Sequence, residues 1–170
     1  MNTVRNISEI DDLQSIACSF AELLDDPSNH DIAIEFPNSA ARYSGSPDQV
    51  LRNLAETQRA CQPSVRQQFV AFSGGRAVGL SVVGFAQEVP DGIDHSWPNV
   101  SSFVCNPYRN QGIGRLSLLE QLTAVDTQFN GRAWTAVKKA NDFSHRMVTH
   151  AGFVMQGEDG DSKIYAYHSN

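Results

Sequence analysis

The sequence predicts an α/β protein of the α+β kind, with one mixed, mostly antiparallel sheet of about six to seven strands flanked by about four helices. Its length of 170 residues favours a single domain over residues 1–170. Two β-rich runs, Gln67–Ser73 and Ala77–Gln87, are joined through a Gly-Gly pair, which predicts an antiparallel hairpin. The stretch from Val100 to Val137 reads strand, helix, strand, which predicts a parallel, right-handed crossover.

Hydrophobic periodicity and punctuation by Gly and Pro divide the chain into eleven elements. They are, in order, a strand at Asn2–Ile7, a helix after Ser8 up to Leu24, a helix from Pro47 to Cys61, strands at Gln67–Ser73, Ala77–Gln87 and Trp97–Cys105, a helix at Arg115–Phe129, a strand at Arg132–Val137, a helix at Asp142–Ala151, and strands at Phe153–Gln156 and Ser162–His168.

Local signals justify the helix starts and the core faces. Ser8, with an acidic residue three positions later, is expected to cap the first helix, and Ser46, followed by Pro47, the second. In the third helix, apolar residues from Leu118 to Phe129 form one stripe, which is typical of core packing. Residues 28–45 show no clear period, so we expect a loop there, with a short extended piece near Ile32.

Composition narrows the class of protein. Three well-separated cysteines indicate reduced thiols and a cytoplasmic location, since they form no disulfide framework. No apolar run approaches a membrane span, and the net charge of −6 argues against nucleic acid as a partner. His145 and His150 are five residues apart, which does not align them on one helix face, so we expect no metal site.

The most informative stretch is Arg109-Asn110-Gln111-Gly112-Ile113-Gly114, between a predicted strand and a predicted helix. Two glycines one residue apart let the backbone approach a ligand closely. The first-turn N–H groups of the following helix, and the positive end of its dipole, suit a pyrophosphate. Arg109 adds a cation.

This stretch resembles the coenzyme A loop of the GCN5-related N-acetyltransferases (GNAT family), whose pattern is Gln/Arg-x-x-Gly-x-Gly/Ala. Arg109, Gly112 and Gly114 fill its fixed positions. A second segment, Asn141-x-x-Ser144 followed by Gly152-Phe153, is similar to the family's Asn-x-x-Ala/Ser … Gly-Phe segment. The two matches are separated by one helix and one strand, as in that family.

The resemblance implies acetyl-coenzyme A as donor and a sheet that splays between its fourth and fifth strands. Backbone N–H groups of the loop would hold the pyrophosphate, and the backbone of Val104 would meet the pantetheine amide and polarise the thioester carbonyl. For Asn141 two roles stay open: a bond to the pantetheine arm, or an ordinary helix N-cap. The implied cofactor-binding residues are Phe103, Val104, Arg109, Asn110, Gln111, Gly112, Ile113, Gly114, Arg115, Asn141 and Ser144.

The acid and the base of the reaction are harder to identify. The family's tyrosine acid, seven residues after the Asn, corresponds here to Val148, and Tyr108 lies too close to the turn to replace it. His95 is the candidate general base, with Glu35 and Glu88 behind it and a water chain without a dominant base as the alternative. Cys105 is expected to be a small buried residue.

The function predicted from these features is acetyl transfer to a primary amine of a small molecule. The alternatives are an N-terminal or lysine acetyltransferase of proteins and a non-catalytic acyl-coenzyme A sensor. The expected partners exclude nucleic acid and membranes, and a homodimer is left open. Four acidic residues are expected to border the acceptor side and to steer a protonated amine; the alternative is a solvated surface. These are Glu35, Glu158, Asp159 and Asp161.

Overall fold

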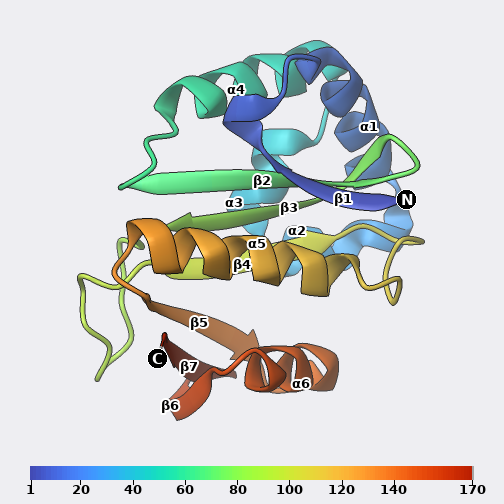
Figure 1. Cartoon of the computed structure of the whole chain (residues 1–170). Helices are drawn as coiled ribbons and strands as arrows, with labels where there is room; N and C mark the ends of the chain where they lie inside the picture. Colours follow the sequence, from blue (N-terminus) through green and yellow to red (C-terminus); the bar gives the residue numbers. More distant parts are fainter. Residues whose placement is uncertain (170) are drawn as a thin grey trace. The chain divides into compact units, whose positions relative to one another are not determined.

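The computed structural model describes residues 1–169, leaving aside the side chain of Pro37. Over these residues seven strands form one mixed sheet in the order β1-β2-β3-β4-β5-β7-β6 (Figure 1). The strands are β1 (Asn2–Asn6), β2 (Arg66–Ser73), β3 (Arg76–Gly84), β4 (Asn99–Val104), β5 (Arg132–Lys138), β6 (Val154–Asp159) and β7 (Ser162–His168). The α-helices are α1 (Leu13–Asp25), α2 (His30–Glu35), α3 (Pro37–Tyr43), α4 (Pro47–Ala60), α5 (Ile113–Gln128) and α6 (Asp142–His150).

Strand pairing confirms the predicted fold class. β1 pairs antiparallel with β2, and β7 pairs antiparallel with both β5 and β6. β4 and β5 are parallel, with Asn99 opposite Trp134 near the start of both strands. A pairing at that end is consistent with the expected splay further along. No helix within residues 1–169 is long and apolar enough to cross a membrane.

The chain divides into two compact units. Unit 1 comprises Met1–Cys61, Gln68–Ser81 and Ser102–Ser117, and unit 2 comprises Gln62–Gln67, Val82–Ser101 and Leu118–Asn170. A single domain over the whole chain therefore stays a prediction, and each unit is described by itself.

In unit 1, α1 and α4 lie side by side (Figure 1). Each buries residues at helical spacing, with Ile16 and Phe20 on α1 and Val50 and Leu54 on α4. Ser46 caps α4 as predicted. The predicted cap at Ser8 is wrong, because residues 7–9 form a separate 3-10 turn and α1 begins after Asp12, whose carboxylate accepts from the Ser15 amide at 3.0 Å.

Residues 27–43 are largely helical, which corrects the predicted loop and the short extended piece near Ile32. α2 and α3 meet at Phe36, whose non-helical backbone (φ −129°, ψ 58°) precedes the Pro that starts α3. Ile32 is the buried residue of α2, and Tyr43 is fully buried at the end of α3. Because each helix is so short, no apolar period could show in the sequence.

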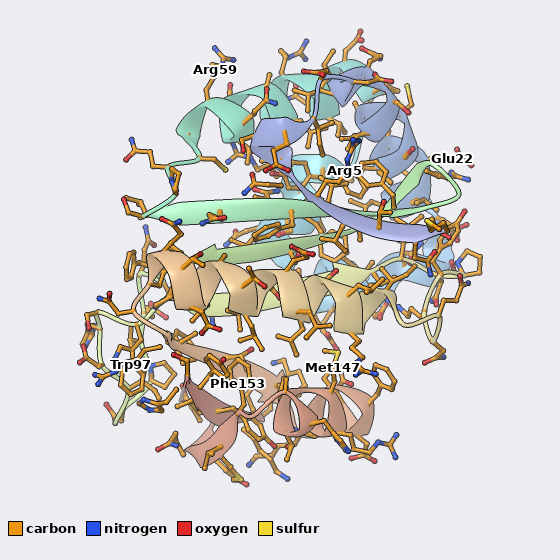
Figure 2. The ribbon with its side chains drawn as sticks, in the orientation of Figure 1. Arg5, Glu22, Arg59, Trp97, Met147 and Phe153 are labelled. Carbon is orange, nitrogen blue, oxygen red and sulfur yellow. The ribbon has the colours of Figure 1, made fainter. Side chains whose placement is uncertain are left out.

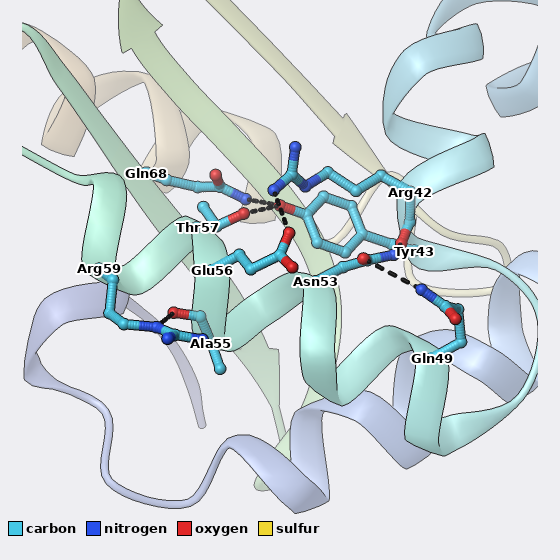
Figure 3. Close-up of polar contacts among 9 residues, drawn as sticks. All are labelled: Arg42, Tyr43, Gln49, Asn53, Ala55, Glu56, Thr57, Arg59 and Gln68. Carbon is cyan, nitrogen blue, oxygen red and sulfur yellow. Dashed lines mark hydrogen bonds and ion pairs between the residues drawn. The ribbon is translucent and has the colours of Figure 1, made fainter.

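A buried polar network joins α3, α4 and β2 (Figure 3). The Tyr43 hydroxyl lies 2.9 Å from the Thr57 hydroxyl and accepts from Nε2 of Gln68 at 2.9 Å. All three side chains are buried. Because each donor or acceptor without a partner in the interior costs free energy, this network fixes how the helices seat on the strand.

In unit 2, the β6–β7 hairpin carries the acidic segment that was predicted as a loop. β6 continues to Asp159, and the turn is confined to Gly160 and Asp161. A bulge between Met155 and Gly157 shifts the register, so the acidic residues pair with β7. α6 packs on this hairpin through His145 and Tyr165.

The loop between β3 and β4 is held on unit 2 by aromatic packing. Trp97 lies in this loop just before β4 (Figure 2), with its ring edge-on to His168 at 4.7 Å. Val89 and Ile93 of the same loop pack with Trp134 of β5. Residues 88–93 therefore have a defined place beside β5.

Candidate functional site

Residues 109–115, the turn before α5 together with the first three residues of that helix, are named the cofactor turn and belong to unit 1. Asn110 and Gly112 adopt positive φ angles of 62° and 78°. The first bond of the helix runs from the Leu116 amide to the Gly112 carbonyl, at 3.1 Å. The N–H groups of Ile113, Gly114 and Arg115 thus have no partner within the helix, and they form the positive end of its dipole.

The outer face of the cofactor turn is open at Gly112. A side-chain carbon built there would have no atom within 4 Å. Neighbouring contacts fix the position of the turn: Asn2 donates to the Gln111 carbonyl, and Gln111 donates to the Pro107 carbonyl. The turn is therefore accessible at Gly112 and fixed in position by these hydrogen bonds. Together with helix N–H groups that lack an intrahelical partner, this is the geometry of an anion-binding site.

Arg109 is engaged within the protein. Its Nε donates to the Val104 carbonyl at 2.7 Å, and Nη1 pairs with Asp31 at 2.6 Å. The expectation that it brings a free cation to the turn therefore needs adjustment, because Asp31 offsets much of its charge. Arg109 instead ties the cofactor turn to the end of β4 and to α2.

A second tie was missed by sequence reasoning. Asn29 is 2% exposed; its Nδ2 donates to the Leu23 carbonyl and its Oδ1 accepts from the Asn106 amide at 2.6 Å. Asn106 in turn donates to the Ser28 carbonyl. No motif marks Asn29 in the sequence, since its partner Asn106 is 77 positions away. It anchors the start of the loop that leads to the cofactor turn.

At the end of β4, the backbone of Val104 is directed away from β3. The Cys105 amide donates to the Val78 carbonyl on β3, and peptide groups alternate in direction along a strand. The N–H of Val104 therefore points to the opposite edge, as the predicted backbone role requires. The Phe103 side chain packs instead against Phe20 and Phe36 in the core.

Cys105 is fully buried. Burial raises the pKa of its thiol to about 12. A thiol that stays protonated at neutral pH is a poor nucleophile, so the structure supports the expected role of a small core residue.

In unit 2, Asn141 acts as the N-cap of α6. Its side chain accepts from the Ser144 amide at 3.1 Å, which favours the capping alternative of the two that the sequence left open. Val148, at the position of the family's tyrosine, is 4% exposed and packs inside unit 2. The structure therefore offers no hydroxyl at this position.

One turn after Asn141, His145 forms a pair that sequence reasoning did not find. Its Nδ1 lies 2.9 Å from the hydroxyl of Tyr165, which is 6% exposed. Its Nε2 is buried and has no hydrogen-bond partner among the described residues. The hydrogen bond fixes the imidazole of His145 against β7 within unit 2. No spacing in the sequence connects these two residues, because β7 brings them together.

His95 lies in an exposed turn of unit 2. The turn is closed by Asp94, whose carboxylate accepts from the amide and the hydroxyl of Ser96 at 2.8 Å. These bonds lower the pKa of Asp94. Among the described residues, no hydrogen bond or ring contact orients the imidazole of His95, so its role as general base stays a prediction.

The acidic residues near the β6–β7 turn are partly neutralised. Glu158 pairs with Lys139, and Asp161 accepts from Lys138 at 2.7 Å. The hydrogen bonds from Lys139 and Lys138 lower the pKa values of Glu158 and Asp161, respectively. Glu35 is an exposed residue of α2 in unit 1. Among the described residues, no three His, Cys, Asp or Glu side chains are placed to hold a metal ion.

The fold is that of known acetyltransferases, although no protein-family model and no curated protein matches the sequence. The chain is similar to a PaiA N-acetyltransferase from Thermoplasma acidophilum in complex with coenzyme A, with 16% identity, 99% of each chain covered and a TM-score of 0.64. It is also similar to RimL, a ribosomal L7/L12 alpha-N-protein acetyltransferase in complex with coenzyme A, with 13% identity, 98% and 94% covered and a TM-score of 0.69.

A third similar structure is PseH, a Campylobacter jejuni N-acetyltransferase in complex with acetyl coenzyme A. Identity is 15%, both chains are fully covered, and the TM-score is 0.59. Another similar structure is described as an acetyltransferase of the GNAT family from Streptococcus pneumoniae. The chain has the GNAT fold, as the sequence motifs predicted.

Proposed function

We propose that this protein is an acetyl-coenzyme A-dependent N-acetyltransferase that acetylates a primary amine of a small molecule. The observation that carries the proposal is the geometry of the cofactor turn. Its first helical N–H groups have no partner within α5, and no atom lies within 4 Å of a side-chain carbon built at Gly112. The fold likeness adds support, since similar structures hold coenzyme A or acetyl coenzyme A. Neither observation depends on a particular side chain being present.

In this proposal the donor is held mainly by backbone groups. The N–H groups of Ile113, Gly114 and Arg115 bind the pyrophosphate, and Asn110 and Gln111 shape the turn in front of them. The N–H of Val104, directed away from β3, bonds the pantetheine amide or the thioester carbonyl. Asn141 and Ser144 support the start of α6.

The chemistry asks little of the side chains. A neutral amine nitrogen attacks the thioester carbon, the carbon–sulfur bond breaks, and the thiolate then takes up a proton while the new ammonium loses one. A free thiol has a pKa of about 8.5, so the thiolate leaves without a dedicated acid at modest cost. A reaction without a dedicated acid is compatible with Val148 at the position of the family's tyrosine. The amine can lose its proton to water or to an exposed base such as His95.

The buried Val148 also favours one alternative of a different class, a sensor that binds acyl-coenzyme A without turnover. Incubation with acetyl-coenzyme A and a panel of amines separates the two. An enzyme releases free thiol together with an equal amount of acetylated amine, both dependent on the amine. Coenzyme A binding without amine-dependent thiol release would overturn the enzymatic proposal and support the sensor. Acetylation of protein N-termini or lysines, with no small amine accepted, would overturn the acceptor class.

A further inference from the structure

Unit 2 contains a cavity of about 730 Å³ that the cofactor turn does not use. Three segments line it: residues 88–91 after β3, Trp134 and Ala136 on β5, and the β6–β7 hairpin from Gln156 to Ser162 with Ile164. Its volume lies in the range of about 300–1,000 Å³ that small-molecule sites occupy. We name it the cation pocket.

The strand register shows which acidic side chain of the hairpin shares the pocket face. Asp159 of β6 pairs with Ser162 of β7, and Ala136 of β5 pairs with Ile164, two residues further along β7. The side chains of directly opposite residues project to the same face of a sheet. Along one strand, successive side chains project to alternate faces. Asp159 therefore lies on the face of Ala136 and Ile164. Glu158, opposite Lys163 and paired with Lys139, lies on the other face.

The pocket retains negative charge after its ion pairs are counted. Five carboxylate residues line it, and of these Asp161 is held by Lys138 and Glu158 by Lys139. Glu88, Asp91 and Asp159 have no ion-pair partner among the described residues. A mixed pocket with three unneutralised carboxylates favours a cation.

The remaining wall is apolar and holds a polar group without a partner. Trp134 is 5% exposed and packs with Val89 and Ile164, which also line the pocket. Its indole Nε1–H is buried and has no hydrogen-bond partner among the described residues. Because buried donors are nearly always bonded, and an N–H group can donate to an aromatic ring, this indole favours a ligand with an aromatic, apolar body.

We infer that the cation pocket binds a small protonated amine with an apolar body, held by Glu88, Asp91 and Asp159. This inference goes beyond the proposed function and stands without it, because the pocket lies wholly within unit 2. An organic cation is favoured over a metal ion, since no three acidic or other ligand side chains within residues 1–169 are close enough to coordinate one.

The test is calorimetry without acetyl-coenzyme A, using three probes of matched shape: phenethylamine, phenethyl alcohol and 3-phenylpropionate. The pocket predicts that the amine binds at least about tenfold more tightly than the alcohol, and that the anion binds weakest. Added salt weakens amine binding, because exposed charges are screened over about 8–10 Å. Equal affinities for the amine and the alcohol would overturn the inference.

Variants locate the binding. Glu88→Gln, Asp91→Asn and Asp159→Asn combined should weaken phenethylamine binding roughly tenfold and remove the preference over the alcohol. The control Asp11→Asn, Asp48→Asn and Glu120→Gln makes the same charge change outside the pocket and should leave affinity within about twofold. Unchanged affinity in the pocket triple, or an equal loss in the control, would overturn the inference.

A second variant blocks the pocket without touching its charges. Ala136 is exposed on the pocket face, so Ala136→Phe should fold normally and still weaken phenethylamine binding by about tenfold or more. If phenethylamine binds in the pocket and no amine of the panel is acetylated, the proposed function fails and the pocket inference stands. If amines are acetylated while both variants bind and react normally, the pocket inference fails and the function stands.

Discussion

The cofactor turn and the cation pocket are built by opposite means. The turn places main-chain N–H groups by positive φ angles at Asn110 and Gly112, and the side chain of its Arg109 is already paired inside the protein. The pocket is lined by side chains from three separate segments. Its net charge depends on which carboxylates are not paired with a lysine. A backbone site tolerates the loss of side-chain groups but not a shift of its backbone, whereas a side-chain site loses affinity when its charged groups are removed.

The largest effect on stability is expected where backbones approach most closely. A side-chain carbon at Gly79 would lie 2.6 Å from the Phe103 carbonyl oxygen, so Gly79→Ala forces β3 and β4 apart. We expect a loss of about 1–3 kcal/mol or more in the free energy of unfolding, with weaker coenzyme A binding. Gly157→Ala in β6, where nothing lies within 4 Å, is the control and should be nearly neutral in urea denaturation. Similar losses in both variants would break the comparison.

The interior of unit 1 should depend on the Tyr43 hydroxyl. Tyr43→Phe leaves Thr57 and Gln68 without their shared partner in a buried site, which costs about 1–3 kcal/mol. Tyr167→Phe in unit 2 removes a longer bond, 3.3 Å, to Asp126, and should cost under about 0.5 kcal/mol. Thermal denaturation of both variants measures the difference. A neutral Tyr43→Phe would show that the network contributes no net stability.

Unit 2 offers a test of the missing acid. Because Val148 is buried, Val148→Tyr should overpack the site and cost about 1–3 kcal/mol, with no gain in kcat. The control is Val154→Tyr, at a residue that is 62% exposed, which should leave stability and turnover unchanged. A stable Val148→Tyr variant with faster turnover would mean that position 148 reaches the leaving thiolate after all.

The smallest effect concerns the exposed lysine pairs. Hydrogen bonds from Lys139 and Lys138 lower the pKa values of Glu158 and Asp161 below the usual range near 4. The stability they contribute is therefore present above the unfolded-state pKa and is lost as pH falls through the lowered folded-state values. Lys138→Gln with Lys139→Gln should lower the urea midpoint slightly at pH 7 and have no effect near pH 2. A difference that does not change with pH would show that these pairs act through something other than charge.

The same contrast explains what the sequence predicted. The cofactor turn was predictable because its residues are contiguous and its geometry follows from Gly spacing at a strand–helix junction. The sheet and the longer helices followed from periodicity. The helices at His30–Glu35 and Pro37–Tyr43 were not predictable, since each is too short to show a period. The cation pocket was beyond reach because a bulge after Met155 decides which face Asp159 occupies.

Partners distant in sequence were missed for a related reason. The loop before the cofactor turn is anchored by Asn29, and His145 is bonded to Tyr165, but neither pair has a local signature. Arg109 shows the converse: the motif identified the residue, and the structure gave it a partner, Asp31, that lies on a helix the sequence did not predict.

The central claim is that the cofactor turn binds coenzyme A through its backbone, and calorimetry of coenzyme A with Gly112→Glu tests it most directly. Gly112 faces open space at a φ of 78°, so the new carboxylate would stand before the free N–H groups and repel the pyrophosphate. Gly45→Glu, at a φ of 97° with nothing within 4 Å, is the matched control. The account predicts a loss of about a hundredfold or more for Gly112→Glu, roughly 2.7 kcal/mol, and normal affinity for Gly45→Glu. Unchanged affinity in a folded Gly112→Glu protein would contradict it.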